Sequence, residues 1–122
     1  MGHSKLAEAY VGLGDVHAVG VDPDFKKAEG FYRQAEQIDP GSPRPPVGLG
    51  NIWLGQGRIH DAIGQYQASL KATRQRSEPD YGAHAGLAAA YFDLGQYRLA
   101  IEQSNRAIGA RPNAIIPLLQ LA

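Results

Sequence analysis

A spaced pattern of large and small residues recurs three times along the chain, and it constrains the fold more than any other feature. Each copy has a leucine followed by a small residue and then, on a second stretch, an alanine with another packing residue four positions later. The copies contain Tyr10, Leu13, Gly14, His17, Ala28, Tyr32 and Pro40; then Pro46, Leu49, Gly50, Trp53, Ala62 and Tyr66; then His84, Leu87, Ala88, Tyr91, Ala100, Ser104 and Pro112. The leucines of successive copies, continued by Leu121, lie 36, 38 and 34 residues apart. A repeat of this length predicts pairs of helices stacked in a row, each packed on its neighbours.

Turn residues divide the repeats into six expected helices. We predict them at residues 5–19, 24–38, 45–56, 59–76, 80–94 and 97–110. The turn in the first unit is longer than the later ones, and there we expect Asp22 to cap the next helix and Pro23 to take its first position. The predicted fold class is all-α, a right-handed α-solenoid of antiparallel helix pairs with three units and a partial fourth helix.

Small residues at fixed places indicate close packing within each pair. Gly14, Gly50 and Ala88 leave space on the first helices, and Ala28, Ala62 and Ala100 leave it on the second. The aromatic residues fall at helical spacing on the same faces, so we interpret them as core rather than as a ligand cage. These residues are Tyr10, Phe25, Tyr32, Trp53, Tyr66, Tyr91 and Tyr97.

The amino-acid composition of the chain excludes several classes of function. The chain of 122 residues carries twelve basic and twelve acidic side chains, so no overall field favours nucleic acid. The absence of cysteine excludes disulfides and thiolate metal sites, and no apolar run approaches the roughly 18 residues of a spanning helix. The compartment stays open.

No motif places catalytic or metal-binding residues together. His17, His60 and His84 are at least 24 residues apart, and Asp22, Asp24 and Glu29 lack the rest of a calcium loop. The basic residues Lys71, Arg74 and Arg76 are followed at once by acidic ones, which is typical of a solvated helix end. We therefore predict no cofactor, no metal and no enzymatic activity.

The chain resembles the tetratricopeptide repeat family. The segments Ala7-Glu-Ala-Tyr10 with Leu13-Gly14, and Gly95-Gln-Tyr97 with Ala100-Ile101, are close to the consensus of that family, whereas the second unit departs from it at Pro46. The resemblance implies units at about 5–40, 43–78 and 80–112, with a partial fourth unit at 113–122. Residues 1–4 are expected to be a cloning remnant.

The resemblance also implies a function, a non-catalytic scaffold that binds a peptide or helix of a partner protein along the concave face of the first helices. Carried over to this sequence, the groove comprises Glu8, Val11, Gly12, Asp15, Arg44, Val47, Gly48, Asn51, Leu54, Ala85, Gly86, Ala89 and Phe92. We expect Gly12, Gly48 and Gly86 to clear the groove for a bound backbone, and Asn51 to hydrogen-bond it. Co-chaperone members clamp an acidic peptide with basic side chains, but Asp15 and the glycines argue against a carboxylate clamp here.

The last residues suggest association with another copy. Ala114–Ala122 keeps the register of the repeat but offers Ile115, Ile116, Leu118 and Leu119 on more than one side. We expect these four residues to form an oligomer contact. The alternative to the peptide scaffold is a structural or self-assembly segment excerpted from a larger tetratricopeptide protein.

Overall fold

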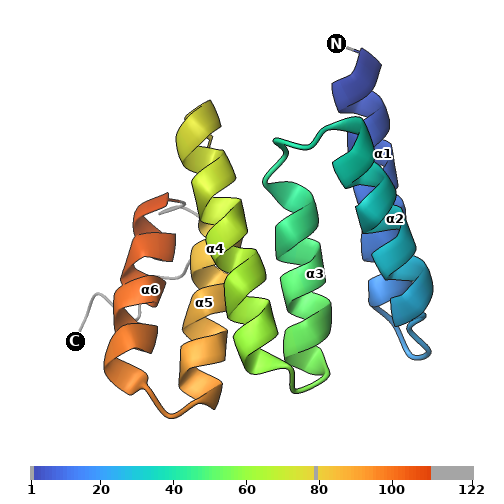
Figure 1. The fold of residues 1–122 in the computed structure, drawn as a ribbon. Coiled ribbons are helices and arrows are strands. Elements are labelled where there is room, and N and C mark those ends of the chain that lie inside the picture. The colour runs from blue at the N-terminus through green and yellow to red at the C-terminus, as the bar shows by residue number, and fades with distance from the viewer. Residues whose placement is uncertain (1, 79, 111–122) are drawn as a thin grey trace.

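The computed structural model describes residues 2–78 and 80–110, which form six helices and no strand. The helices are α1 (Gly2–Ala18), α2 (Phe25–Ile38), α3 (Arg44–Gly55), α4 (Ile59–Arg76), α5 (Tyr81–Asp93) and α6 (Tyr97–Ala110). They form three pairs side by side, with α1 and α2 at one end of the row and α5 and α6 at the other (Figure 1). The predicted all-α solenoid of helix pairs is confirmed, and the helix ends agree with the sequence within a few residues.

Glycines in the left-handed region end the first helix of each pair. Gly57 and Gly95 have φ values of 81° and 78°, and Gly20 has 109° in the longer first turn. A side chain would strain the backbone at these angles. The predicted cap of the second helix is wrong, because Asp24, and not Asp22, accepts a 3.0 Å hydrogen bond from the backbone N–H of Lys27. The helix consequently begins at Phe25, two residues after Pro23.

Two buried tyrosine rings join the pairs into one array. The ring of Tyr32 on α2 lies between α1 and α3, where Cβ atoms on Gly14 and Gly48 would come within 2.5 and 2.3 Å of it. Tyr66 on α4 repeats the arrangement between α3 and α5, and the two glycines that face its ring are Gly50 and Gly86. Each ring therefore fills space that two glycines on neighbouring first helices leave open.

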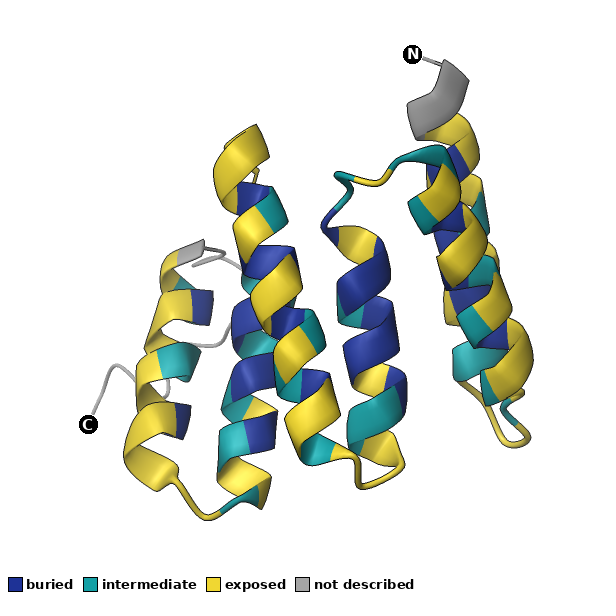
Figure 2. Ribbon diagram, viewed as in Figure 1, coloured by how far each residue is buried: buried dark blue, intermediate teal, exposed yellow. Residues whose placement is uncertain are grey.

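Burial follows this packing. Half of the residues of α3, the first helix of the middle pair, are buried (Figure 2). Ala28, Ala62 and Ala100 are buried, as the small-residue pattern predicts. The aromatic prediction holds for six of the seven residues but is wrong for Tyr97, which is 59% exposed and lies edge-to-face with Phe92, with 5.4 Å between the ring centroids.

Polar contacts tie the first pair to the second. Both guanidinium nitrogens Nη1 and Nη2 of Arg76, at the end of α4, bond the carboxylate of Asp39, which caps the end of α2. Within the second pair, Ser69 Oγ on α4 donates a 2.8 Å hydrogen bond to the carbonyl of Pro43, the residue before α3. Arg76 thus has a specific partner 37 residues away, and is not simply part of a solvated helix end. The segment with Ile115, Ile116, Leu118 and Leu119 lies outside the described residues.

Candidate protein-binding groove

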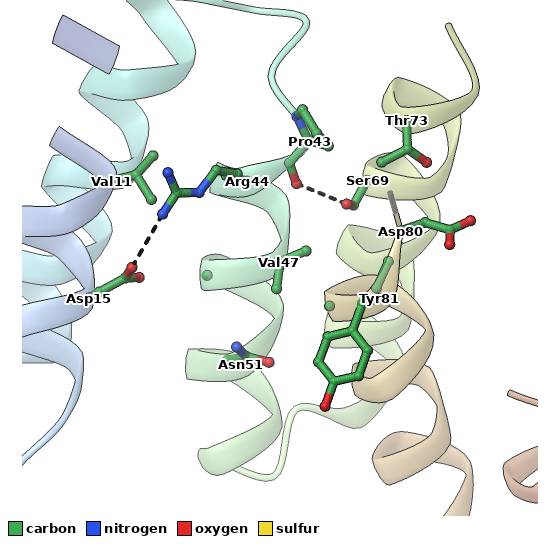
Figure 3. A pocket seen from close by; sticks show the side chains of 13 residues that line it. Val11, Asp15, Pro43, Arg44, Val47, Asn51, Ser69, Thr73, Asp80 and Tyr81 are labelled. Carbon is green, nitrogen blue, oxygen red and sulfur yellow. Dashed lines mark hydrogen bonds and ion pairs between the residues drawn. The ribbon is translucent and has the colours of Figure 1, made fainter. Parts of the chain in front are cut away.

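A cavity of about 390 Å³ opens where the first helices α1, α3 and α5 lie next to one another. In Figure 3, the labelled lining side chains come from α1 and α3 and, beyond α3, from α4 and the start of α5. The lining comprises Val11, Asp15, Pro43, Arg44, Val47, Gly48, Asn51, Ser69, Thr73, Asp80, Tyr81, Gly82 and Ala83. Volume and lining are suitable for a few side chains of another polypeptide.

The structure brings six of the predicted groove residues together in this cavity. They are Val11, Asp15, Arg44, Val47, Gly48 and Asn51. A smaller cavity of about 180 Å³ shares Asp15, Gly48 and Asn51 and continues toward Val19 and Phe25. The two cavities form one groove across α1 and α3, which we call the α1–α3 groove.

The remaining predicted groove residues do not line either cavity. They are Glu8, Gly12, Leu54, Ala85, Gly86, Ala89 and Phe92. Leu54 packs against the core between the second and third pairs, and Phe92 is exposed beside Tyr97. The predicted stripe therefore divides: six of its residues on α1 and α3 line these cavities, and none of its α5 residues does.

One prediction about the groove floor is wrong, and one predicted floor residue offers little surface. Val11 lines the cavity, but only 3% of it is exposed because it packs in the core with Tyr32 and Leu49. Gly48 and Gly86 were expected to clear space for a ligand. Their missing side chains instead accommodate the rings of Tyr32 and Tyr66, so these glycines serve the contact between repeats.

The same tyrosines orient two groove side chains. The Tyr32 hydroxyl donates to Asp15 Oδ1 at 2.5 Å, and the Tyr66 hydroxyl donates to Asn51 Oδ1 at 2.6 Å. Asp15 and Asn51 occupy equivalent positions, two residues after the leucine of each unit. Because its oxygen is engaged, Asn51 has its Nδ2 amide hydrogens left as the groups to offer a ligand.

Burial also affects the acidity of these tyrosines. It raises the pKa of Tyr66 to about 12. The pKa of Tyr32 is raised further, mainly by burial and then by the hydrogen bond to the Asp15 carboxylate and its charge. Both hydroxyls consequently stay protonated donors at neutral pH.

The charges in the α1–α3 groove are mixed. Arg44 reaches from α3 toward Asp15 on α1, with 3.9 Å between Nη2 and Oδ2 (Figure 3). Both side chains are about half exposed, so the pair is weakly held and open to other partners. Asp80 lies at the other side of the cavity, with Oδ2 3.1 Å from Nε2 of His84. One guanidinium and two carboxylates give the lining a slight negative balance.

Several lining residues were not predicted, namely Pro43, Ser69, Thr73, Asp80, Tyr81 and Ala83. Ser69 and Thr73 belong to a second helix, whereas the prediction considered first-helix positions alone. The sequence could have indicated Ser69 and Thr73, because they place hydroxyl groups on the buried face of α4 where apolar residues are expected. Asp80 and Tyr81 precede or begin α5, at a place that repeat spacing does not distinguish from an ordinary helix start.

The arrangement of the helix pairs is also found in known proteins. A sequence profile of the tetratricopeptide repeat matches residues 47–115, which is more than half of the chain. The protein belongs to the tetratricopeptide repeat family. The N-terminal domain of stress-induced protein-1 (STI-1) from C. elegans is similar to this tetratricopeptide array in fold, with a TM-score of 0.71 and 16% identity over 89% of this chain and 87% of that one. No curated protein sequence matches the array.

Membership of the tetratricopeptide repeat family makes the chain a protein–protein interaction scaffold, because stacked helical repeats present extended surfaces to protein partners. Tetratricopeptide repeats are interaction modules and not catalytic ones. Across residues 2–78 and 80–110, no helix combines the length and apolar character needed to cross a membrane. The same residues contain no cluster of three histidine or carboxylate side chains that could hold a metal.

Proposed function

We propose that this tetratricopeptide array binds a segment of a partner protein, extended or helical, in the α1–α3 groove. The groove has the volume for protruding side chains, and its polar groups lie on two helices that the buried tyrosines hold in place. A rigid site loses less entropy when it binds a flexible segment.

The observation that carries the proposal is the hydrogen bond from Tyr66 to Asn51. It leaves Nδ2 as an oriented amide donor beside a hollow surface, which suits the carbonyl of a peptide backbone. One neutral hydrogen bond of this kind contributes roughly 0.5–1.5 kcal/mol to binding.

The charges of the α1–α3 groove restrict which kind of segment can bind there. Asp15 and Asp80 repel a carboxylate, and Arg44 is already shared with Asp15. We therefore expect a neutral or basic segment and not an acidic C-terminus. A lysine or arginine of the partner would displace the weakly held Arg44 and pair with Asp15 in its place.

The test begins with peptides selected on the wild-type array from a displayed random library. Their affinities are then measured by fluorescence anisotropy for wild type, Asn51→Ala, Asn51→Asp and Asn105→Ala. Asn51→Asp keeps an acceptor for Tyr66, as Asp15 does for Tyr32, but removes the amide donor. Asn105 is an exposed asparagine on α6 that lines neither cavity, so it is the matched control.

For neutral peptides we expect both Asn51 variants to weaken binding several-fold while Asn105→Ala binds as wild type, with circular dichroism unchanged in all. Basic peptides are compared on Asn51→Ala alone, because the added charge of Asn51→Asp would attract them. Selected peptides should also contain more basic than acidic residues. Equal affinities for the four proteins, or consistently acidic peptides, would remove the α1–α3 groove as the binding site.

A further inference from the structure

Helix α1 carries an apolar stripe that no described residue covers. It consists of Ala9, Gly12, Leu13 and Val16, at the i, i+3, i+4 and i+7 spacing of one helix face. Leu13 is 43% exposed and Val16 is 67% exposed. Leu6, one turn earlier, extends the stripe and is also exposed.

The same four positions are buried on the other first helices. On α3 they are Pro45, Gly48, Leu49 and Ile52, and on α5 they are Ala83, Gly86, Leu87 and Ala90. Leu49 is 0% exposed and Leu87 is 2% exposed, because each packs in the core of the preceding pair. The stripe is thus a helix-packing surface that the repeat builds on every first helix.

Gly12 marks the place where this surface stays open on α1. A Cβ atom on Gly12 would meet no atom within 4 Å, whereas Cβ atoms on Gly48 and Gly86 would each lie 2.3 Å from a tyrosine ring. The stripe therefore presents a hollow at Gly12 directly beside a projecting Leu13.

We infer that α1 pairs with α1 of a second copy of this chain, antiparallel and about a twofold axis near residue 11. Four residues of the stripe are symmetric about that point, because Leu6 and Val16 lie five residues on either side and Ala9 and Leu13 lie two. Across the axis Leu13 meets Ala9 of the second copy and enters the hollow at its Gly12, while Leu6 meets Val16. A patch that is complementary to itself in this way is what an isologous dimer requires.

The contact is small. One pair of helices of this length buries less than the roughly 1,200 Å² of a stable standard interface. The dimer should therefore dissociate on dilution, and it should be found in a monomer–dimer equilibrium that depends on concentration.

Sedimentation equilibrium of the full chain over a range of concentrations tests the pairing. Gly12→Leu fills the hollow, and the monomer should tolerate it because no atom lies within 4 Å of the new Cβ. Gly64→Leu is the matched control, since Gly64 is an exposed helix glycine on α4 with equally open surroundings. We expect wild type and Gly64→Leu to dimerise and Gly12→Leu to stay monomeric, with an unchanged or higher melting temperature.

Orientation is tested by cross-linking, since the chain has no cysteine of its own. Leu6→Cys and Val16→Cys proteins, mixed under oxidising conditions, should form disulfides mainly between unlike chains. Like-with-like cross-links would contradict the antiparallel arrangement.

Three results would overturn the α1 dimer. The first is a wild type that stays monomeric at the highest concentration. The second is a Gly12→Leu protein that dimerises as wild type does. The third is a dimer lost with Ile116→Glu and Leu119→Glu but kept with Gly12→Leu, because it would move the contact to the C-terminal segment.

Discussion

The ring of Tyr32 occupies the space that a side chain on Gly48 would need, with only 2.3 Å between a Cβ atom at that position and Cζ of the ring. The ring is held on its other side by Gly14 and is buried, so it has little room to move. Gly48 is therefore a contact between repeats, and its substitution reports on folding before it reports on ligand binding.

Gly48→Ala should destabilise the fold by about 1–3 kcal/mol, because the added methyl group overpacks the Tyr32 ring. Gly12→Ala is the matched control at the equivalent position of α1, where the space is open. It should raise stability by about 0.5–1 kcal/mol through helix propensity. Urea denaturation measures both, and a change of the same sign in the two variants would contradict the assigned contact.

Ala100→Leu should destabilise by about 1–3 kcal/mol, since Ala100 is buried between α5 and α6 and a larger side chain overpacks that contact. Ala68→Leu, at an exposed position of α4, should change the melting temperature little. Equal thermal melts for Ala100→Leu and wild type would show that the helix pair closes differently.

Tyr66→Phe should remove a dependence of stability on alkaline pH. The folded pKa of Tyr66, about 12, lies above the unfolded value of about 10. The protonated Tyr66 hydroxyl therefore contributes fully to the free energy of unfolding below pH 10, and this contribution is lost as pH rises from 10 to 12. Urea denaturation across this range should show a flatter profile for Tyr66→Phe, and parallel profiles would contradict the burial of this hydroxyl.

Tyr66→Phe should also cost roughly 0.5–1.5 kcal/mol at neutral pH, because the hydrogen bond to Asn51 is lost while the ring remains. In a double-mutant cycle with Asn51→Ala, the stability lost in the double mutant should be smaller than the sum of the losses in the two single mutants. Additive losses would mean that the hydroxyl and the amide do not interact.

Asp39→Asn should remove a dependence of stability on acidic pH. Hydrogen bonds from Arg76 hold the pKa of the Asp39 carboxyl below its usual value. Its contribution is present above about pH 4 and is lost as pH falls through the lower folded value. At neutral pH the substitution should cost roughly 0.5–1 kcal/mol, as expected for a partly exposed pair. Acid titration followed by circular dichroism should show a flatter profile for the variant.

The repeat, the helix pairs and most helix ends could be predicted from the sequence alone. These features depend on spacing along one helix and on turn residues such as Gly57 and Gly95, whose backbone angles are set locally. Six of the residues that line the α1–α3 groove were also predictable, because residues at the same place in each unit align along neighbouring first helices.

The contacts that each repeated residue makes depend on how the helix pairs stack, and they are known only from the tertiary structure. Gly12, Gly48 and Gly86 each come directly before the leucine of their own unit. A tyrosine ring nevertheless faces only Gly48 and Gly86. Which side chain lies opposite a glycine depends on how the next pair stacks, and this arrangement is not encoded within one helix. The same reason explains the partner of Arg76, which is 37 residues away, and the hydrogen bond that leaves Asn51 its amide as a donor.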